Sequence, residues 1–186
     1  MRGALLACTL LAAALPAAAQ PVAIQAQGAW THAPSGMVFP EHVGPFRRIA
    51  IYRYDQQGLD VGANYHLGDP AQAIASFYVY PAPRTASCTG EFNTRKQELE
   101  QAREGARLVR EEEEAAPGRA AKMRGRVAAY LFRADFFGKP QPVLSELHLF
   151  CHVAGRWFVK YRLSAPEAQA PAAFRAFMNT LPWTLN

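Results

Sequence analysis

The stretch LSELHLFCHVAGRWFVKYRLS, residues 144–164, decides the fold of this chain, because two alternating apolar runs in it meet at one glycine. Alternation with a period of two is typical of strands that bury one face, and a short loop containing glycine joins two such strands into a hairpin. A loop of three residues, 153–155, places Gly155 where this turn needs a left-handed backbone. The stretch therefore predicts an antiparallel hairpin.

The register of this hairpin predicts which side chains are buried together. A three-residue loop puts two apolar rows on one face, and a slip by one residue would turn one row toward water. The buried rows are Leu147, Leu149, Cys151 and Val153 on the first strand and Trp157, Val159, Tyr161 and Leu163 on the second. The opposite face pairs Glu146 with Arg162 and His148 with Lys160. We take it as the candidate binding face, formed by Glu146, His148, Phe150, Phe158, Lys160 and Arg162.

The rest of the chain predicts a sheet with helices around it. Three alternating runs separated by turn residues are typical of an antiparallel meander, at residues 46–54, 59–67 and 73–80. One segment with helical spacing follows Thr89, and another follows Pro166. Residues 107–114 and 127–137 are two further strands, and the acidic run 111–114 lies opposite basic residues in this hairpin. We therefore expect an α+β fold, a mainly antiparallel sheet covered by helices.

The first residues have the features of a secretory signal peptide. Arg2 precedes an apolar stretch that is too short to span a bilayer, and Ala17 to Ala19 supply the small residues that signal peptidase needs. We expect cleavage near Ala19 and a protein that is periplasmic or secreted. Cys8 leaves a lipid anchor open as an alternative. The expected parts are a signal peptide at residues 1–19, a flexible lead-in at 20–36 and a single α+β domain at 37–186.

The composition of the 186 residues, 50% hydrophobic and 19% charged, is that of a globular domain and excludes a disordered or low-complexity chain. A net charge of +5 is too small to indicate nucleic acid as a partner. After the signal peptide, no segment is apolar for long enough to predict a transmembrane helix.

Two cysteines, Cys88 and Cys151, remain after the expected cleavage. An even pair in an exported chain predicts a disulfide, and the alternative is two separate buried thiols. The bond would close a loop of about 60 residues and add about 4 kcal/mol to the stability. It would tie the start of the first helix to the sheet, which is a structural role.

No catalytic motif is present in the sequence. The chain lacks the Gly-x-Ser-x-Gly and Ser-x-x-Lys patterns of serine hydrolases and the glycine-rich loops that bind phosphates or dinucleotides. His148 and His152 lie about 13 Å apart on one strand, so they cannot chelate one ion without another ligand. We therefore expect no catalytic residue, cofactor or metal. Five tyrosines form either a ligand-stacking face or cross-strand packing: Tyr52, Tyr54, Tyr65, Tyr78 and Tyr80.

Several short motifs carry a resemblance to known proteins. They are WFVKYRLSAP at residues 157–166 before the last helix, LPW at 181–183, FP at 39–40 and GPFRR at 44–48. With these motifs the chain resembles a group of uncharacterised exported bacterial proteins. More loosely, its order of elements is similar to that of PsbP, the extrinsic protein of photosystem II. The resemblance implies a PsbP-like α/β/α sandwich and an accessory or binding module, and it transfers no functional residue to this chain.

Export and the absence of a catalytic motif together predict a non-catalytic binding or accessory domain for an envelope partner or a small ligand. Two alternatives stay open. One is a small envelope hydrolase with a site built from scattered residues, which requires a deep pocket and a buried, partnered histidine. The other is a structural component of the envelope, which requires a large exposed apolar patch.

Overall fold

The computed structural model describes residues 20–117 and 122–183. The expected signal peptide, its cleavage site after Ala19 and Cys8 lie outside the described residues. Of the described residues, 50% are in strands and 16% are in helices. The expected α+β, PsbP-like sandwich with helices covering the sheet is therefore wrong, and the described chain has a β-rich fold with two short helices.

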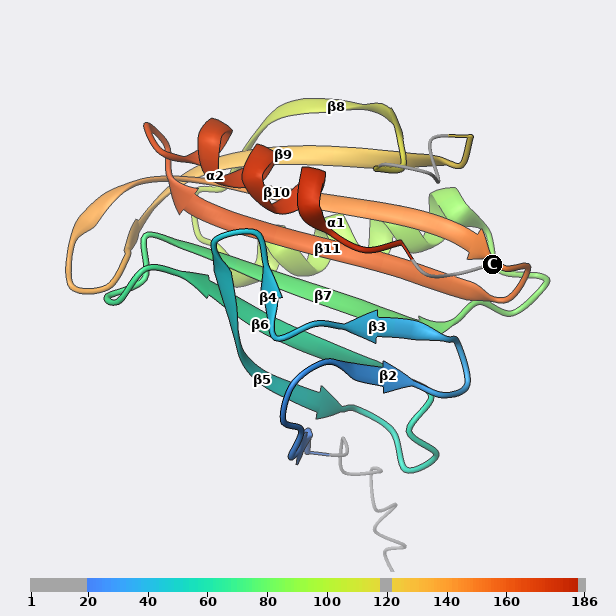
Figure 1. Cartoon of the computed structure of the whole chain (residues 1–186). Helices are drawn as coiled ribbons and strands as arrows, with labels where there is room; N and C mark the ends of the chain where they lie inside the picture. Colours follow the sequence, from blue (N-terminus) through green and yellow to red (C-terminus); the bar gives the residue numbers. More distant parts are fainter. Residues whose placement is uncertain (1–19, 118–121, 184–186) are drawn as a thin grey trace, which may run out of the picture.

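Within the described residues, nine strands form one antiparallel sheet in the order β1-β5-β6-β7-β11-β10-β9-β8, and β4 pairs with the start of β5 (Figure 1). A separate two-stranded sheet is formed by β2 and β3. The bounds of the strands are β1 (Val22–Ile24), β2 (Trp30–His32), β3 (Met37–Phe39), β4 (His42–Val43), β5 (Phe46–Arg53), β6 (Val61–Leu67), β7 (Ala73–Pro81), β8 (Arg107–Ala115), β9 (Arg124–Asp135), β10 (Pro140–Val153) and β11 (Trp157–Pro166).

The large sheet has two faces, which we name after the helices that lie on them. The α2 face carries α2 (Ala170–Thr180) and the β2–β3 hairpin, and the α1 face carries α1 (Cys88–Ala102), which lies behind the sheet in Figure 1. On the α2 face, the ring of Phe177 packs against Phe46 and that of Phe39 against Phe77. On the α1 face, Leu99 belongs to a second core cluster. Each face therefore has its own apolar core.

The β2–β3 hairpin covers part of the sheet, which we expected helices to cover. The ring of His32 lies 5.5 Å from that of Trp157, so β2 and β3 cover the first part of the Trp157 row. Residues 20–36, expected to be a flexible lead-in, contain β1 and β2. The guanidinium group of Arg48 donates hydrogen bonds to the backbone oxygens of Ala26, Gly28 and Phe39. These contacts order the segment, and they exist only in the folded chain, so residue patterns do not reveal them.

The hairpin of β10 and β11 forms as expected, but its register differs by one residue. Leu147 pairs with Arg162 and His148 pairs with Tyr161. Leu147, Leu149 and Cys151 therefore lie on the α1 face, whereas the Trp157 row and Val153 lie on the α2 face. The cause is a bulge between Phe150 and Val153, in which His152 has a left-handed φ of 52°. A bulge adds one residue to one strand and reverses the alternation beyond it. Both rows are still buried, because both faces are covered.

The expected disulfide between Cys88 and Cys151 is confirmed. Its sulfur atoms are 2.03 Å apart and its Cα atoms are 5.8 Å apart, with a sequence separation of 63 residues. Cys88 is the first residue of α1, and Ser87 caps this helix by accepting a hydrogen bond from the backbone N–H of Gly90. The bond therefore fixes the start of α1 to β10.

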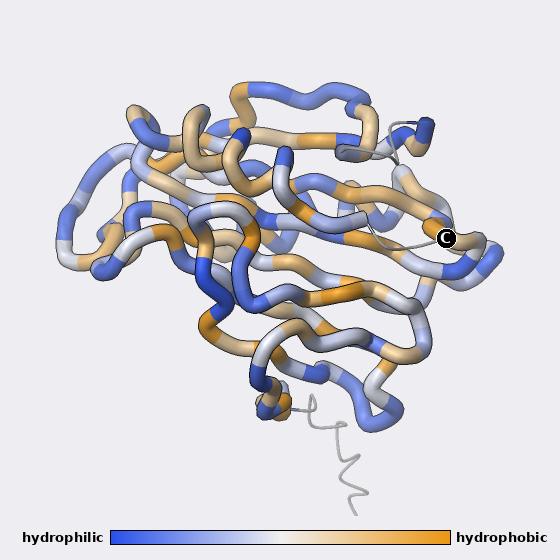
Figure 2. Tube along the Cα trace, viewed as in Figure 1, coloured by the Kyte–Doolittle hydropathy of each residue, from blue (hydrophilic) through white to orange (hydrophobic). Residues whose placement is uncertain are grey.

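The strand β8 forms the exposed edge of the sheet, and most of it is hydrophilic (Figure 2). Its acidic run lies opposite the basic start of β9, as expected. Glu113 pairs with Arg126 in the register, and the Arg126 guanidinium donates to Glu111 at 2.8 Å. Charged side chains on an edge strand discourage pairing with other chains.

Candidate ligand-binding site

The structure divides the six residues of the expected binding face between the two faces of the sheet. Glu146, His148 and Phe150 of β10 lie on the α2 face, whereas the three residues of β11, Phe158, Lys160 and Arg162, lie on the α1 face. Phe150, Phe158 and His148 are also buried. The six residues therefore form no common surface patch, and the bulge in β10 is the physical reason.

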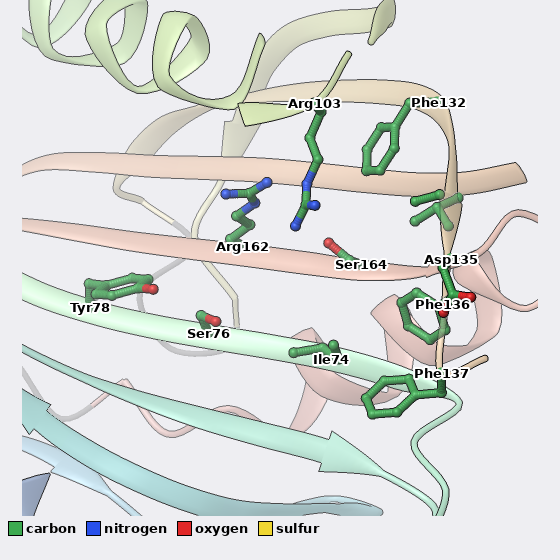
Figure 3. A pocket seen from close by; sticks show the side chains of 12 residues that line it. Ile74, Ser76, Tyr78, Arg103, Phe132, Asp135, Phe136, Phe137, Arg162 and Ser164 are labelled. Carbon is green, nitrogen blue, oxygen red and sulfur yellow. The ribbon is translucent and has the colours of Figure 1, made fainter. Parts of the chain in front are cut away.

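A pocket lies on the α1 face, where α1 ends and leaves the sheet uncovered. Its volume is about 380 Å³, and it is enclosed by β7, β11, the residue after α1 and the loop between β9 and β10 (Figure 3). The wall consists of a polar part and an aromatic part. The polar part is formed by Ser76, Tyr78, Arg103, Asp135, Arg162 and Ser164, and the aromatic part by Phe132, Phe136 and Phe137. The Asp135 carboxylate accepts a hydrogen bond from the backbone N–H of Gly138 and forms no ion pair with either arginine.

Strand alternation and register place the polar part of the wall. On β11 the residues Lys160, Arg162 and Ser164 point to the α1 face, because the residues between them form the apolar row of the α2 face. Arg162 pairs with Ser76 of β7, so these two side chains are direct neighbours. Arg103 follows the last residue of α1 and reaches the same space from above the sheet (Figure 3).

The two arginines in the pocket have no carboxylate partner among the described residues. Neither Arg103 nor Arg162 forms an ion pair there, and one terminal guanidinium nitrogen of Arg162 is buried without a hydrogen-bond partner. Burial lowers the pKa of Arg162, and the positive charge of Arg103 acts in the same direction. A buried, unpaired donor is costly, so this arrangement favours an anion that accepts hydrogen bonds from both groups.

The aromatic part of the wall can hold an apolar group. The ring centres of Phe136 and Phe137 are 5.3 Å apart, and the rings meet edge to face at an interplanar angle of 75°. Phe137 is 46% exposed and has a left-handed φ of 52°, which is uncommon for a residue with a side chain. Its ring also lies 5.7 Å from that of His66. The loop thus holds a phenyl ring at the rim of the pocket.

A second pocket adjoins the first and shares Tyr78 with it. Its volume is about 270 Å³, and Tyr54, Asp60, Tyr80, Arg95 and Lys160 complete its lining. The Lys160 ammonium group lies 4.2 Å from the centre of the Tyr78 ring. Burial, and after it the charge of Arg95, lowers the pKa of Lys160 to about 8.

The tyrosines, like the residues of the expected binding face, are divided between the two faces of the sheet. Tyr65 lies in the core of the α2 face, where its ring is 5.7 Å from Phe177. Tyr54 packs against Tyr78 at 5.9 Å between ring centres. The ring of Tyr78 occupies the space of a missing side chain, because a Cβ atom at Gly62 would lie 2.4 Å from its Cδ1 atom. Tyr54 and Tyr78 therefore pack against each other, and with Tyr80 they also line the second pocket.

His148, which we expected at the surface, is buried with two carboxylates. Its Nδ1 atom is 2.6 Å from Glu114 of β8, and its Nε2 atom is 3.1 Å from Glu146. Burial alone would lower the pKa of His148, but the hydrogen bonds to both carboxylates outweigh it and raise the pKa to about 9. His148 lies on the α2 face, across the sheet from the pocket, so it cannot act on a ligand bound there.

The other strand histidine of the sequence analysis, His152, is 3.2 Å from the backbone oxygen of Ala86 through its Nε2 atom. In the part of the chain that the structure describes, no three His, Cys, Asp or Glu side chains are grouped so that they could hold a metal ion.

Arg103, Ser76 and Ser164 were not predicted from the sequence as site residues, whereas Arg162 was. One signal could have identified Ser164, because polar residues at every second position of β11 alternate with a fully apolar row. Such a strand has two different faces, and the polar one needs partners of its own. Arg103 carries no signal of this kind, since only the length and direction of α1 bring it to β11.

Comparison with protein-family models and with curated proteins found no match for this chain. The pocket must therefore be interpreted from its own residues. Neither of the two helices in the described residues is long and apolar enough to cross a membrane.

Proposed function

We propose that this protein is an exported, non-catalytic binding domain that takes a small organic anion into the pocket on the α1 face. The observation that carries the proposal is the meeting of Arg103 and Arg162 in one pocket without a carboxylate partner among the described residues. Guanidinium groups bind carboxylate and phosphate oxygens through paired hydrogen bonds. An anion would satisfy the buried nitrogen of Arg162.

The aromatic wall indicates what the rest of the ligand resembles. Phe132, Phe136 and Phe137 line the end of the pocket away from Tyr78 (Figure 3). A volume of about 380 Å³ suits a small organic molecule. The ligand that fits is an organic acid with an apolar or aromatic body, whose acid group lies at the arginines.

The disulfide supports the proposed location of the protein. A bond between Cys88 and Cys151 is consistent with an oxidising compartment outside the cytosol. We infer cleavage near Ala19 from the features of residues 1–19 alone, and the disulfide is consistent with a protein that is then periplasmic or secreted. A partner in the envelope or a ligand in the same space would then be available to the pocket.

The proposal is tested by calorimetric titration with hydrocinnamate, which joins a phenyl ring to a carboxylate. We expect binding to the wild type, and an affinity at least tenfold weaker for Arg162→Met, because a charge-assisted hydrogen bond contributes about 1.5–3 kcal/mol. The matched control is Arg133→Met, since Arg133 of β9 is exposed and outside the pocket. The uncharged amide of hydrocinnamate should bind more weakly than the acid.

Thermal melting establishes that each variant is folded before the titration. The proposal fails if hydrocinnamate does not bind the wild type, or if the two Arg→Met variants bind it equally well.

A further inference from the structure

The two pockets of the α1 face are neighbours along β7 and β11. They share Tyr78, and their cations, Lys160 and Arg162, occupy alternate positions of β11 on the same face. Residues two apart on a strand are separated by about 7 Å. The pairs Ser164 with Ile74, Arg162 with Ser76 and Lys160 with Tyr78 follow one another along the sheet. A ligand held at Arg162 therefore lies next to Lys160.

Lys160 is the cation of the second pocket whose charge is not already neutralised. Arg95 in the same pocket pairs with Glu91 at 2.6 Å and with Glu98 at 2.5 Å. Lys160 forms no ion pair with any described residue, and its ammonium group rests against the rings of Tyr78 and Tyr80. An amine that is largely removed from water and lacks a counter-ion favours an anionic group beside it.

Asp60 is the acidic residue of this pocket, and its effect on a bound anion is limited. It is not within ion-pair distance of Lys160, and burial raises the pKa of its carboxyl group. Three cations, Lys160, Arg162 and Arg103, thus face the two pockets without an ion pair in the described chain. Two carboxyl groups lie there as well, that of Asp60 and that of Asp135, which accepts a hydrogen bond from the backbone N–H of Gly138.

We infer, on the basis of the proposed function, that the ligand is a diacid with an apolar substituent. Its first acid group lies at Arg103 and Arg162, its second lies at Lys160, and its apolar group lies against the phenylalanines at the other end. Lys160 is then the residue that distinguishes a diacid from a monoacid.

The test compares hydrocinnamate with diacids that keep its phenyl ring and first carboxylate. Benzylsuccinate, benzylglutarate and benzyladipate add a second carboxylate at increasing distance from the first. We expect one of them to bind the wild type about tenfold more tightly than hydrocinnamate does, as one further charge-assisted hydrogen bond predicts. Calorimetric titration measures all four acids under the same conditions.

The variant Lys160→Met should lose this gain and keep the affinity of the wild type for hydrocinnamate. Lys160→Arg retains the charge and should keep most of the gain. The control Lys122→Met removes an exposed lysine and should change neither affinity. If Lys160→Met does not fold, Lys160→Gln replaces it, and the comparison of the four acids on the wild type needs no variant.

The two proposals fail in different ways. If hydrocinnamate binds through Arg162 but none of the diacids binds more tightly, the inference about Lys160 is wrong and the proposed function stands. The same conclusion follows if Lys160→Met keeps the full gain. If no acid binds, or Arg162→Met has no effect, the proposed function itself is wrong.

Discussion

The buried imidazolium group of His148 links β10 to β8. It is 4% exposed, and its two ring nitrogens face Glu114 of β8 and Glu146 of β10. Arg110 of β8 also donates to Glu146, and Tyr161 of β11 is the cross-strand neighbour of His148. Two carboxylates around one buried ring favour its protonated form, so the pKa of His148 lies at about 9.

This shift predicts a pH dependence of stability. The pKa of His148 in the folded protein, about 9, is above its ordinary value of 6.5, so the stabilisation is complete below pH 6.5 and is lost as the pH rises through 9. We expect the free energy of unfolding to fall by an amount on the order of 3 kcal/mol across this range. Urea titrations at a series of pH values measure the fall, and His148→Gln should largely abolish it.

The difference in unfolding free energy between the wild type and His148→Gln, followed against pH, reports the contribution of His148 alone. The pKa of Lys160 is lowered to about 8, so Lys160 contributes a slope of opposite sign at higher pH in both proteins. His42→Gln is the control, because His42 is exposed on β4. Equal slopes in the wild type and His148→Gln would contradict the assignment.

At the scale of elements, glycine decides how closely an aromatic ring approaches a neighbouring strand. The ring of Phe150 on β10 lies over Gly125 of β9, where a Cβ atom would be 2.4 Å from its Cδ1 atom and 2.7 Å from the backbone oxygen of Leu149. Phe150 also packs against Trp183 at 4.9 Å between ring centres. Because Gly125 has no side chain, the Phe150 ring can lie against β9 and at the same time contact Trp183.

The substitution Gly125→Ala should destabilise the protein by about 1–3 kcal/mol, because the backbone oxygen of Leu149 cannot move away without breaking the strand pair. The control is Gly90→Ala in α1, where the nearest atom would be Cβ of Ser87 at 3.4 Å. Alanine is the better helix former, so this variant should be as stable as the wild type or more stable. Urea melts compare the two, and equal stabilities would contradict the packing argument.

At the scale of the whole molecule, the two cores lie on opposite sides of one sheet. The helix α2 and the β2–β3 hairpin cover one core, and α1 covers the other. The disulfide ties α1 to β10 at one end of the helix, and Arg103 enters the pocket at the other end. The position of α1 on the sheet therefore determines the shape of the pocket.

Removal of the disulfide tests how much the loop closure contributes. The double variant Cys88→Ala/Cys151→Ala should lose about 4 kcal/mol of unfolding free energy, since the bond closes a loop with a separation of 63 residues. Urea melts of the wild type with and without a reducing agent should show the same loss. A double variant with the midpoint of the oxidised wild type would contradict this expectation.

Much of the strand content could be predicted from the residues. The runs around β5, β6, β7 and β11 alternate as half-buried strands do, and the parity of the cysteines predicted their bond. The register of β10 could not be predicted, because both faces of this strand carry apolar residues and alternation then favours neither choice. The register is determined by the bulge at His152, where the backbone has a left-handed φ.

The amino-acid sequence by itself determined the strands β5 to β11, the hairpin at Gly155 and the bond between the cysteines. These depend on hydrophobic periodicity, on turn residues and on the even number of cysteines. Only the tertiary structure decided which rows share a face, that the β2–β3 hairpin covers part of the sheet, and that Arg103 meets Arg162. The physical reason is that each of these depends on contacts between distant segments. Such contacts form only when the whole chain packs around its two cores.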